Sequence, residues 1–176
     1  MMYQPGDLII YGGEGVCRVA AIGPAPIAAA DPERLYYTLT PLYRQGVIYA
    51  PTDVAVPMRP ILSREEALDL IRSIPTMAPD TAEFSDAKQA AQQYKVLLQT
   101  YDYANLLRLI RMIYAKNEQA ITQGKAYSHV EERFLKRARE LLHGELAVAL
   151  GVPPGEVEPL IREHAGTEQN EACPHM

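Results

Sequence analysis

The spacing of apolar residues changes near residue 61, and this change divides the 176-residue chain into two parts. Before it, short apolar runs of strand length alternate with turn residues. After it, apolar residues recur three and four positions apart, which is the period of a helix packed along one side. The chain is therefore predicted to be an α+β protein, with a small antiparallel β-sheet or barrel first and an all-helical module second.

Five runs in the first part are rich in β-branched or aromatic residues and end at Gly, Pro or Asp. The predicted strands cover residues 7–11, 16–22, 35–40, 47–50 and 54–58. Gly12, Gly13 and Gly15 predict a tight turn; a phosphate-binding loop is the less favoured alternative, because no Lys-Ser/Thr pair follows. A sheet of this size leaves at least one strand edge unpaired, and such an edge is a potential docking site.

The second part opens with a capping-box pattern, Ser63 with Glu66, that starts a helix ending at Pro75. Longer helices are predicted over residues 82–99 and 102–119, and a third from a second capping-box pattern, Ser128 with Glu131, to Gly151. A short helix precedes the tail. The predicted organisation is a β-module over 1–60, a short helix and linker over 61–79, a helical module over 80–165 and a disordered tail over 166–176.

The net charge of −5, from 17 basic and 22 acidic residues, argues against a general nucleic-acid coat or a polybasic membrane binder. The charge is unevenly distributed along the chain. Residues 88–139 hold 10 basic and 4 acidic side chains, a net charge of +6, whereas residues 140–176 hold one Arg and 7 Glu. A basic helical block therefore lies within an acidic protein.

Three cations of this block, Arg133, Lys136 and Arg137, are three and four residues apart and are predicted to share one face of a helix. Together they could contact a polyanion such as DNA. The alternative is an ordinary solvated face, with partial pairing to Glu132 and Glu140. Arg108 and Arg111 form a similar pair on the preceding helix, which favours the DNA interpretation modestly.

No constellation of residues in the sequence predicts an active site, a cofactor or a metal centre. The four histidines are scattered, and Cys173 with His175 is too sparse a set for a metal site. Cys17 lies in a predicted strand and is expected to be a buried thiol. Two cysteines, no secretory signal and no apolar run long enough for a membrane span together predict a cytoplasmic binding protein.

The opening run Tyr3 to Gly12, YQPGDLIIYG, resembles the start of the CarD/CdnL family of bacterial RNA polymerase-binding transcription regulators. The strand at 35–39, the run at 47–51 and the VPMRP segment at 56–60 are also similar to the N-terminal module of that family. Residues 131–142 and 144–147 resemble its C-terminal helix. The likeness covers about residues 2–165, and the segments at 36–41 and 149–153 look most like a clostridial-type branch.

This resemblance implies a Tudor-like β-module that docks on the β subunit of RNA polymerase by pairing a strand edge with it. The matching residues are Val47, Ile48, Tyr49 and Ala50. The resemblance also implies that the helical module contacts promoter DNA at the upstream edge of the transcription bubble. The candidate DNA-binding residues are Phe84, Arg108, Arg111, Lys125, Arg133, Lys136 and Arg137.

Well-studied members insert a Trp at the bubble edge, and this chain has no Trp. Phe84 is the nearest aromatic candidate for that role, and the alternative is that Phe84 belongs to the core. The sequence thus predicts a regulator that bridges polymerase and promoter DNA and changes the stability of the open complex. A protein-only adaptor that binds polymerase or another partner without touching DNA is the second hypothesis.

Overall fold

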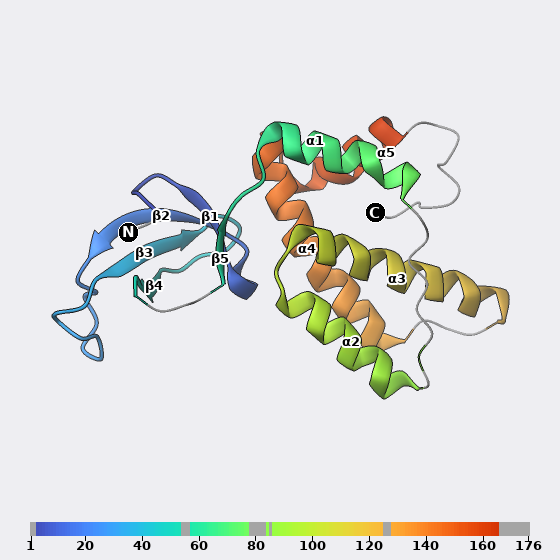
Figure 1. Cartoon of the computed structure of the whole chain (residues 1–176), viewed down its shortest axis with the longest axis horizontal. Coiled ribbons are helices and arrows are strands. Elements are labelled where there is room, and N and C mark those ends of the chain that lie inside the picture. The colour runs from blue at the N-terminus through green and yellow to red at the C-terminus, as the bar shows by residue number, and fades with distance from the viewer. Residues whose placement is uncertain (1–2, 54–56, 78–83, 85, 125–127, 166–176) are drawn as a thin grey trace. The chain divides into compact units, whose positions relative to one another are not determined.

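The computed structural model describes residues 3–53, 57–77, 84, 86–124 and 128–165. The chain divides into two compact units, unit 1 over residues 1–61 and unit 2 over residues 62–176. Unit 1 is an antiparallel sheet and unit 2 is helical (Figure 1), so the predicted α+β class is confirmed. Among the described residues, no helix combines the length and the apolar character that crossing a membrane requires.

Among the residues that the structure describes, the sheet of unit 1 has five antiparallel strands in the order β4-β3-β2-β1-β5. Their bounds are β1 Leu8–Tyr11, β2 Val16–Gly23, β3 Tyr36–Pro41, β4 Ile48–Pro51 and β5 Met58–Pro60. Consecutive strands from β1 to β4 lie side by side, and β5 returns to the free side of β1 (Figure 1). This order makes β4 and β5 the two edges of the sheet.

One face of this sheet forms the core of unit 1. The register places Ile9 opposite Cys17, Val19 opposite Leu39 and Tyr37 opposite Ala50, and all six residues are buried. Tyr3 covers them, with its ring 5.9 Å from that of Tyr37. The predicted buried thiol is confirmed for Cys17, and burial raises its pKa to about 11, so the thiol is protonated and unreactive at neutral pH.

Four of the predicted strands agree with the observed ones to within one residue at each end, and the fifth differs more. β4 begins at Ile48, so Val47 precedes the strand and is exposed. The strand predicted at 54–58 is wrong in its position, because β5 begins at Met58 and Pro57 lies outside it, while residues 54–56 lie outside the described part of the chain. The glycine-rich segment forms the predicted turn as a short 3-10 helix, and Gly12 and Gly15 have φ of 46° and 75°.

In the described part of unit 2, five α-helices pack around one apolar core. They are α1 Arg64–Ser73, α2 Ala87–Gln99, α3 Tyr103–Thr122, α4 His129–Leu150 and α5 Val157–Ala165. α2, α3 and α4 pack against one another, and α1 and α5 pack on α4 and on each other (Figure 1). The core holds the apolar residues that recur at helical spacing, among them Leu107, Ile110 and Leu142.

The two predicted capping boxes have opposite outcomes. The Ser63 box is confirmed: its hydroxyl accepts from the Glu66 amide at 3.1 Å, and the Glu66 carboxylate accepts from the Ser63 amide at 2.8 Å. The Ser128 box is wrong, because the Ser128 side chain makes no capping bond and Glu131 is buried elsewhere. α2 also starts later than predicted, since Asp86 caps it by accepting from the Gln89 amide at 2.7 Å.

His143 in α4 is partly buried beside Arg139, which pairs with Glu158 of α5 at 2.9 Å. Burial, reinforced by the Arg139 charge, lowers the pKa of His143 to about 4. An unfolded histidine keeps a pKa near 6.5. Because the unfolded chain then binds a proton more readily, acid favours unfolding between these two values.

We therefore expect the stability of unit 2 to be constant above about pH 6.5 and to fall as the pH drops toward about 4. The loss assigned to His143 is on the order of 2–3 kcal/mol. Urea unfolding followed by circular dichroism at several pH values checks this, with His143→Gln as the variant that should show a flatter profile. Identical profiles for the two proteins would contradict the assignment to His143.

Candidate functional site

The β4 edge presents main-chain groups to a partner strand. The Thr52 amide donates to the Leu35 carbonyl at 3.0 Å, so residue 52 faces β3. Main-chain groups alternate in direction along a strand, and therefore Ile48 and Ala50 also face β3, whereas Tyr49 and Pro51 face outward. The position of Pro51 agrees with this alternation, because proline has no N–H to offer to β3.

This geometry gives the β4 edge one outward N–H, that of Tyr49, and the outward carbonyls of Tyr49 and Pro51. The Ala50 side chain lies in the core and is fully buried, which fixes the strand against the sheet. Val47 and Leu35 are exposed apolar residues near opposite ends of the β3–β4 pair. A partner strand added here would pair with Tyr49 and find apolar surface at both ends.

An ion pair also holds the end of β4 in place. Arg34 Nε donates to Asp53 Oδ1 at 2.7 Å, across the turn that follows β4. The Arg34 guanidinium holds the pKa of the Asp53 carboxyl below its ordinary value. Both side chains are substantially exposed, so this pair contributes geometry more than stability.

The three cations predicted to share one face, Arg133, Lys136 and Arg137, are all exposed on α4; we call them the basic face. Ala138 next to them is fully buried, so the apolar side of α4 points into the core. Arg137 pairs with Glu140 at 3.3 Å, as the solvated-face alternative expects. Glu132 instead lies 3.3 Å from His129. The structure thus places the three cations on one face of α4, where Arg137 is paired with Glu140.

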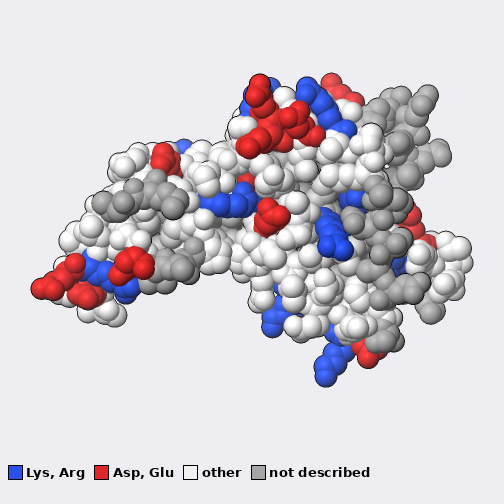
Figure 2. Space-filling model, in the orientation of Figure 1, with Lys and Arg blue, Asp and Glu red and all other residues white. Residues whose placement is uncertain are grey.

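The other candidate DNA-binding residues lie on or beside other helices, or outside the described residues. Arg108 is exposed on α3, and Arg111 Nη2 donates to the Met77 carbonyl at 3.1 Å, which ties α3 to the segment after α1. Lys125 lies outside the described residues. In Figure 2, the charged side chains in view over the α2–α3 region are mostly Lys and Arg, whereas Asp and Glu gather over α1.

Phe84 precedes α2 and is partly buried against the core of unit 2. Its ring packs edge to face on Tyr94 at 5.8 Å, and Phe134 packs on Tyr94 at 5.7 Å. Tyr94 itself is only 1% exposed. Phe84 therefore packs against the core of unit 2, which was the alternative to a role at the bubble edge. It precedes α2, which begins at Ala87.

Glu131 is a residue whose role the sequence pattern misassigned. It is 6% exposed, pairs with Lys116 of α3 and accepts from the Tyr94 hydroxyl at 3.4 Å. Burial and the neighbouring Glu131 carboxylate raise the pKa of Tyr94, so this phenol stays protonated and can donate. These contacts join α2, α3 and α4, and a local sequence pattern carries no signal for them.

Within the described part of the chain, no three His, Cys, Asp or Glu side chains are grouped as a metal site would need. The arrangement consists instead of an exposed strand edge on unit 1 and a cationic helix face on unit 2. Both are surfaces suited to binding macromolecules, by main-chain pairing in one case and by charge in the other.

Residues 3–62 match the family model described as the CarD-like/TRCF RID domain. The matched segment coincides with the sheet of unit 1 and includes both of its edges. The predicted likeness of the helical unit, and the closer likeness to a clostridial-type branch, stay predictions. Unit 1 is therefore a CarD-like/TRCF RID domain, the RNA polymerase-interacting domain of that family.

Proposed function

We propose that this protein is a bacterial transcription regulator that docks on the β subunit of RNA polymerase through the β4 edge. The observation that carries the proposal is an RID domain whose edge strand offers an outward Tyr49 N–H and two outward carbonyls. Main-chain pairing of this kind accepts a strand from a partner without requiring a specific side chain.

The docking half is tested by capturing purified RNA polymerase with the immobilised full-length protein. The expected result is retention of polymerase through its β subunit, which an isolated fragment of β should reproduce. Failure to retain either polymerase or the β fragment would overturn the docking proposal. The variants that locate the contact at β4 are given in the Discussion.

We propose further that the basic face on α4 contacts promoter DNA near the upstream edge of the bubble and thereby changes open-complex stability. The support is charge: three exposed cations on one helix turn, in a segment of net charge +6. Docking through unit 1 raises the effective concentration of this face at the promoter, so a weak intrinsic affinity for DNA is compatible with function.

Reversing two charges should separate DNA contact from general charge effects. We expect Arg133→Glu combined with Lys136→Glu to bind forked promoter DNA at least tenfold more weakly, with the log–log salt slope reduced by about 2. Fluorescence anisotropy across salt concentrations measures both quantities. Arg72→Glu combined with Arg162→Glu, on α1 and α5, makes the same change in net charge and should leave DNA binding within about twofold.

The second candidate is a protein-only adaptor, which the Arg137–Glu140 pair and the overall charge of −5 favour. An adaptor would bind polymerase as strongly as a bridging regulator does. Its association with forked DNA, alone or with polymerase present, would show no contribution from the basic face and no change in salt slope in the double variant. The same anisotropy experiment therefore decides between the two functions.

A further inference from the structure

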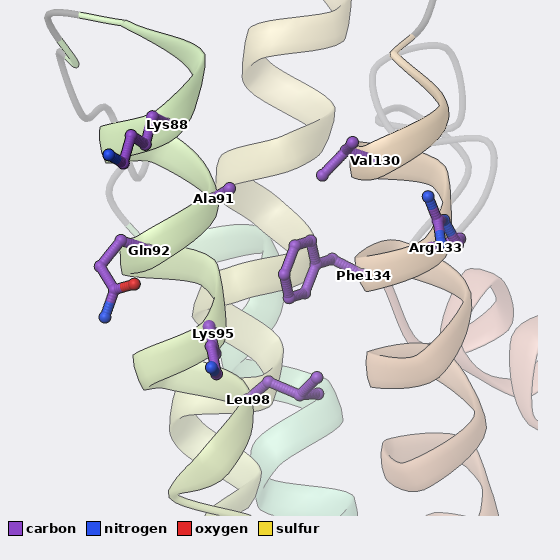
Figure 3. A pocket seen from close by; sticks show the side chains of 8 residues that line it. All are labelled: Lys88, Ala91, Gln92, Lys95, Leu98, Val130, Arg133 and Phe134. Atoms are coloured by element: carbon purple, nitrogen blue, oxygen red, sulfur yellow. The ribbon is translucent and has the colours of Figure 1, made fainter.

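A groove of about 500 Å³ lies between α2 and α4 of unit 2. Its floor is apolar and consists of Ala91 and Leu98 from α2 with Val130 and Phe134 from α4. Figure 3 shows Val130 and Phe134 pointing from α4 toward α2. Val130, in the first turn of α4, is 42% exposed, so it adds apolar surface that a docked partner can cover.

The rim of the groove is cationic. Lys88 and Lys95 lie one above the other on α2, and Arg133 lies on α4 (Figure 3). The groove is lined by no Asp or Glu among the described residues. An apolar floor between cationic rims is the complement of an amphipathic helix with an apolar stripe and acidic flanks.

The dimensions and the floor favour a peptide over a nucleic acid. The α2 wall runs from Lys88 to Leu98, about 15 Å of helix, which accommodates the two turns that the i to i+7 residues of a docked helix span. The only aromatic ring among the groove's lining residues is Phe134, which is already packed edge to face on Tyr94, and the rest of the floor is aliphatic. A stacked base would need an open aromatic face, and duplex phosphates need no apolar floor.

We propose that this groove binds an acidic amphipathic helix of a protein partner. The apolar residues of that helix, at i, i+3, i+4 and i+7, would lie on the floor, and its carboxylates would pair with Lys88, Lys95 and Arg133. The proposal adds a protein contact to unit 2 and stands whether or not the basic face touches DNA.

The probe is a fluorescent, end-blocked peptide of about 14 residues with Leu at the i, i+3, i+4 and i+7 positions and Glu beside them. Its control is a scrambled peptide of the same composition, which keeps the charge and loses the apolar stripe. With the full-length protein, the amphipathic peptide should bind at least tenfold more tightly than the scrambled one. Equal binding of the two peptides would reduce the groove to a nonspecific cationic surface and overturn the proposal.

Matched variants locate the binding. Val130→Ser should weaken peptide binding roughly tenfold, the effect of one buried Val. Val96→Ser is its control: Val96 is similarly exposed, at 48%, on α2 outside the groove, and this variant should bind like the wild type. Lys95→Glu should weaken binding at least tenfold, whereas Lys136→Glu, outside the groove, should change it less than twofold.

An oligonucleotide arm tests the competing occupant. A short oligo(dT) should neither displace the peptide at low micromolar concentration nor lose affinity in Val130→Ser. Displacement of the peptide together with loss of oligo(dT) binding in Val130→Ser would identify a site for nucleic acid and overturn the peptide proposal. Unchanged peptide binding in Val130→Ser would also overturn it. Because all these variants keep unit 1 intact, their outcome is separable from polymerase docking.

Discussion

The Tyr49→Pro variant is expected to lose binding to the β subunit of RNA polymerase while keeping its fold. Tyr49 supplies the outward N–H of β4, and proline has no N–H. A strand of the partner would then face an unsatisfied carbonyl and a ring that obstructs close approach, which together should reduce affinity more than tenfold. Proline is tolerated on an edge strand where the N–H points to solvent, so unit 1 should stay folded.

Two variants control for the side chain and for the other edge. Tyr49→Phe keeps the N–H and should bind polymerase within about threefold of the wild type. Met58→Pro places proline on β5, where the Gly12 amide donates to the Pro57 carbonyl at 2.9 Å, so residue 58 faces outward. Met58→Pro should retain binding. Loss of binding in Met58→Pro with retention in Tyr49→Pro would move docking to β5.

Binding is measured by biolayer interferometry of the full-length protein against the β fragment, with circular dichroism to confirm the fold. The comparison of Tyr49→Pro with Met58→Pro determines which edge of the sheet pairs with polymerase. The two edges offer similar main-chain groups, because each strand ends at a proline and presents one outward N–H, that of Tyr49 on β4 and that of Met58 on β5. β5 is shorter by one residue, and the two proline variants decide between the edges.

The largest expected loss of stability in unit 2 comes from Glu145→Ala. Glu145 is 1% exposed in α4, and its Oε1 accepts from the Leu62 amide at 3.0 Å. Leu62 is buried just before Ser63, the cap of α1, so this carboxylate fixes where α1 begins. Its removal leaves a buried N–H without this acceptor and creates a cavity, at a combined cost of about 2–4 kcal/mol.

Urea unfolding at neutral pH measures this loss. Glu145→Gln keeps an oxygen that can accept from Leu62 and should cost less than Glu145→Ala. Glu140→Ala, at an exposed position on the same helix, should change the free energy of unfolding by no more than about 0.5 kcal/mol. A Glu145→Ala variant as stable as Glu140→Ala would show that the Leu62 contact contributes nothing to the fold.

The elements of the fold were predictable where the signal is local. Strand runs closed by Gly or Pro, the Ser63 cap and helical spacing of apolar residues each specify structure over a few residues. The strand pattern predicted that the sheet has a free edge but not which strand forms it, because strand order depends on pairings between segments far apart in the sequence. The order places β5 beside β1, which no local pattern in residues 54–60 indicates.

In the candidate site, too, contacts between residues far apart in the sequence decide what a side chain does. Ser128 and Glu131 have the spacing of a capping box, yet Glu131 turns to Lys116 and Tyr94. Glu131 is buried where a half-exposed lysine and a buried phenol both reach its carboxylate, and this arrangement replaces a single surface cap. Arg111 likewise has the exposed-cation pattern but contacts the Met77 carbonyl. In each case a tertiary partner decides the role, and a single sequence does not name that partner.

We propose that this protein bridges polymerase and promoter DNA, and the lifetime of the open complex tests that proposal most directly. The full-length wild type should change the rate at which competitor-challenged open complexes decay. Tyr49→Pro and the double variant Arg133→Glu/Lys136→Glu should each restore the rate seen without the protein, the first by losing docking and the second by losing DNA contact. A double variant that still binds polymerase and alters the decay rate as fully as the wild type would contradict the bridging claim.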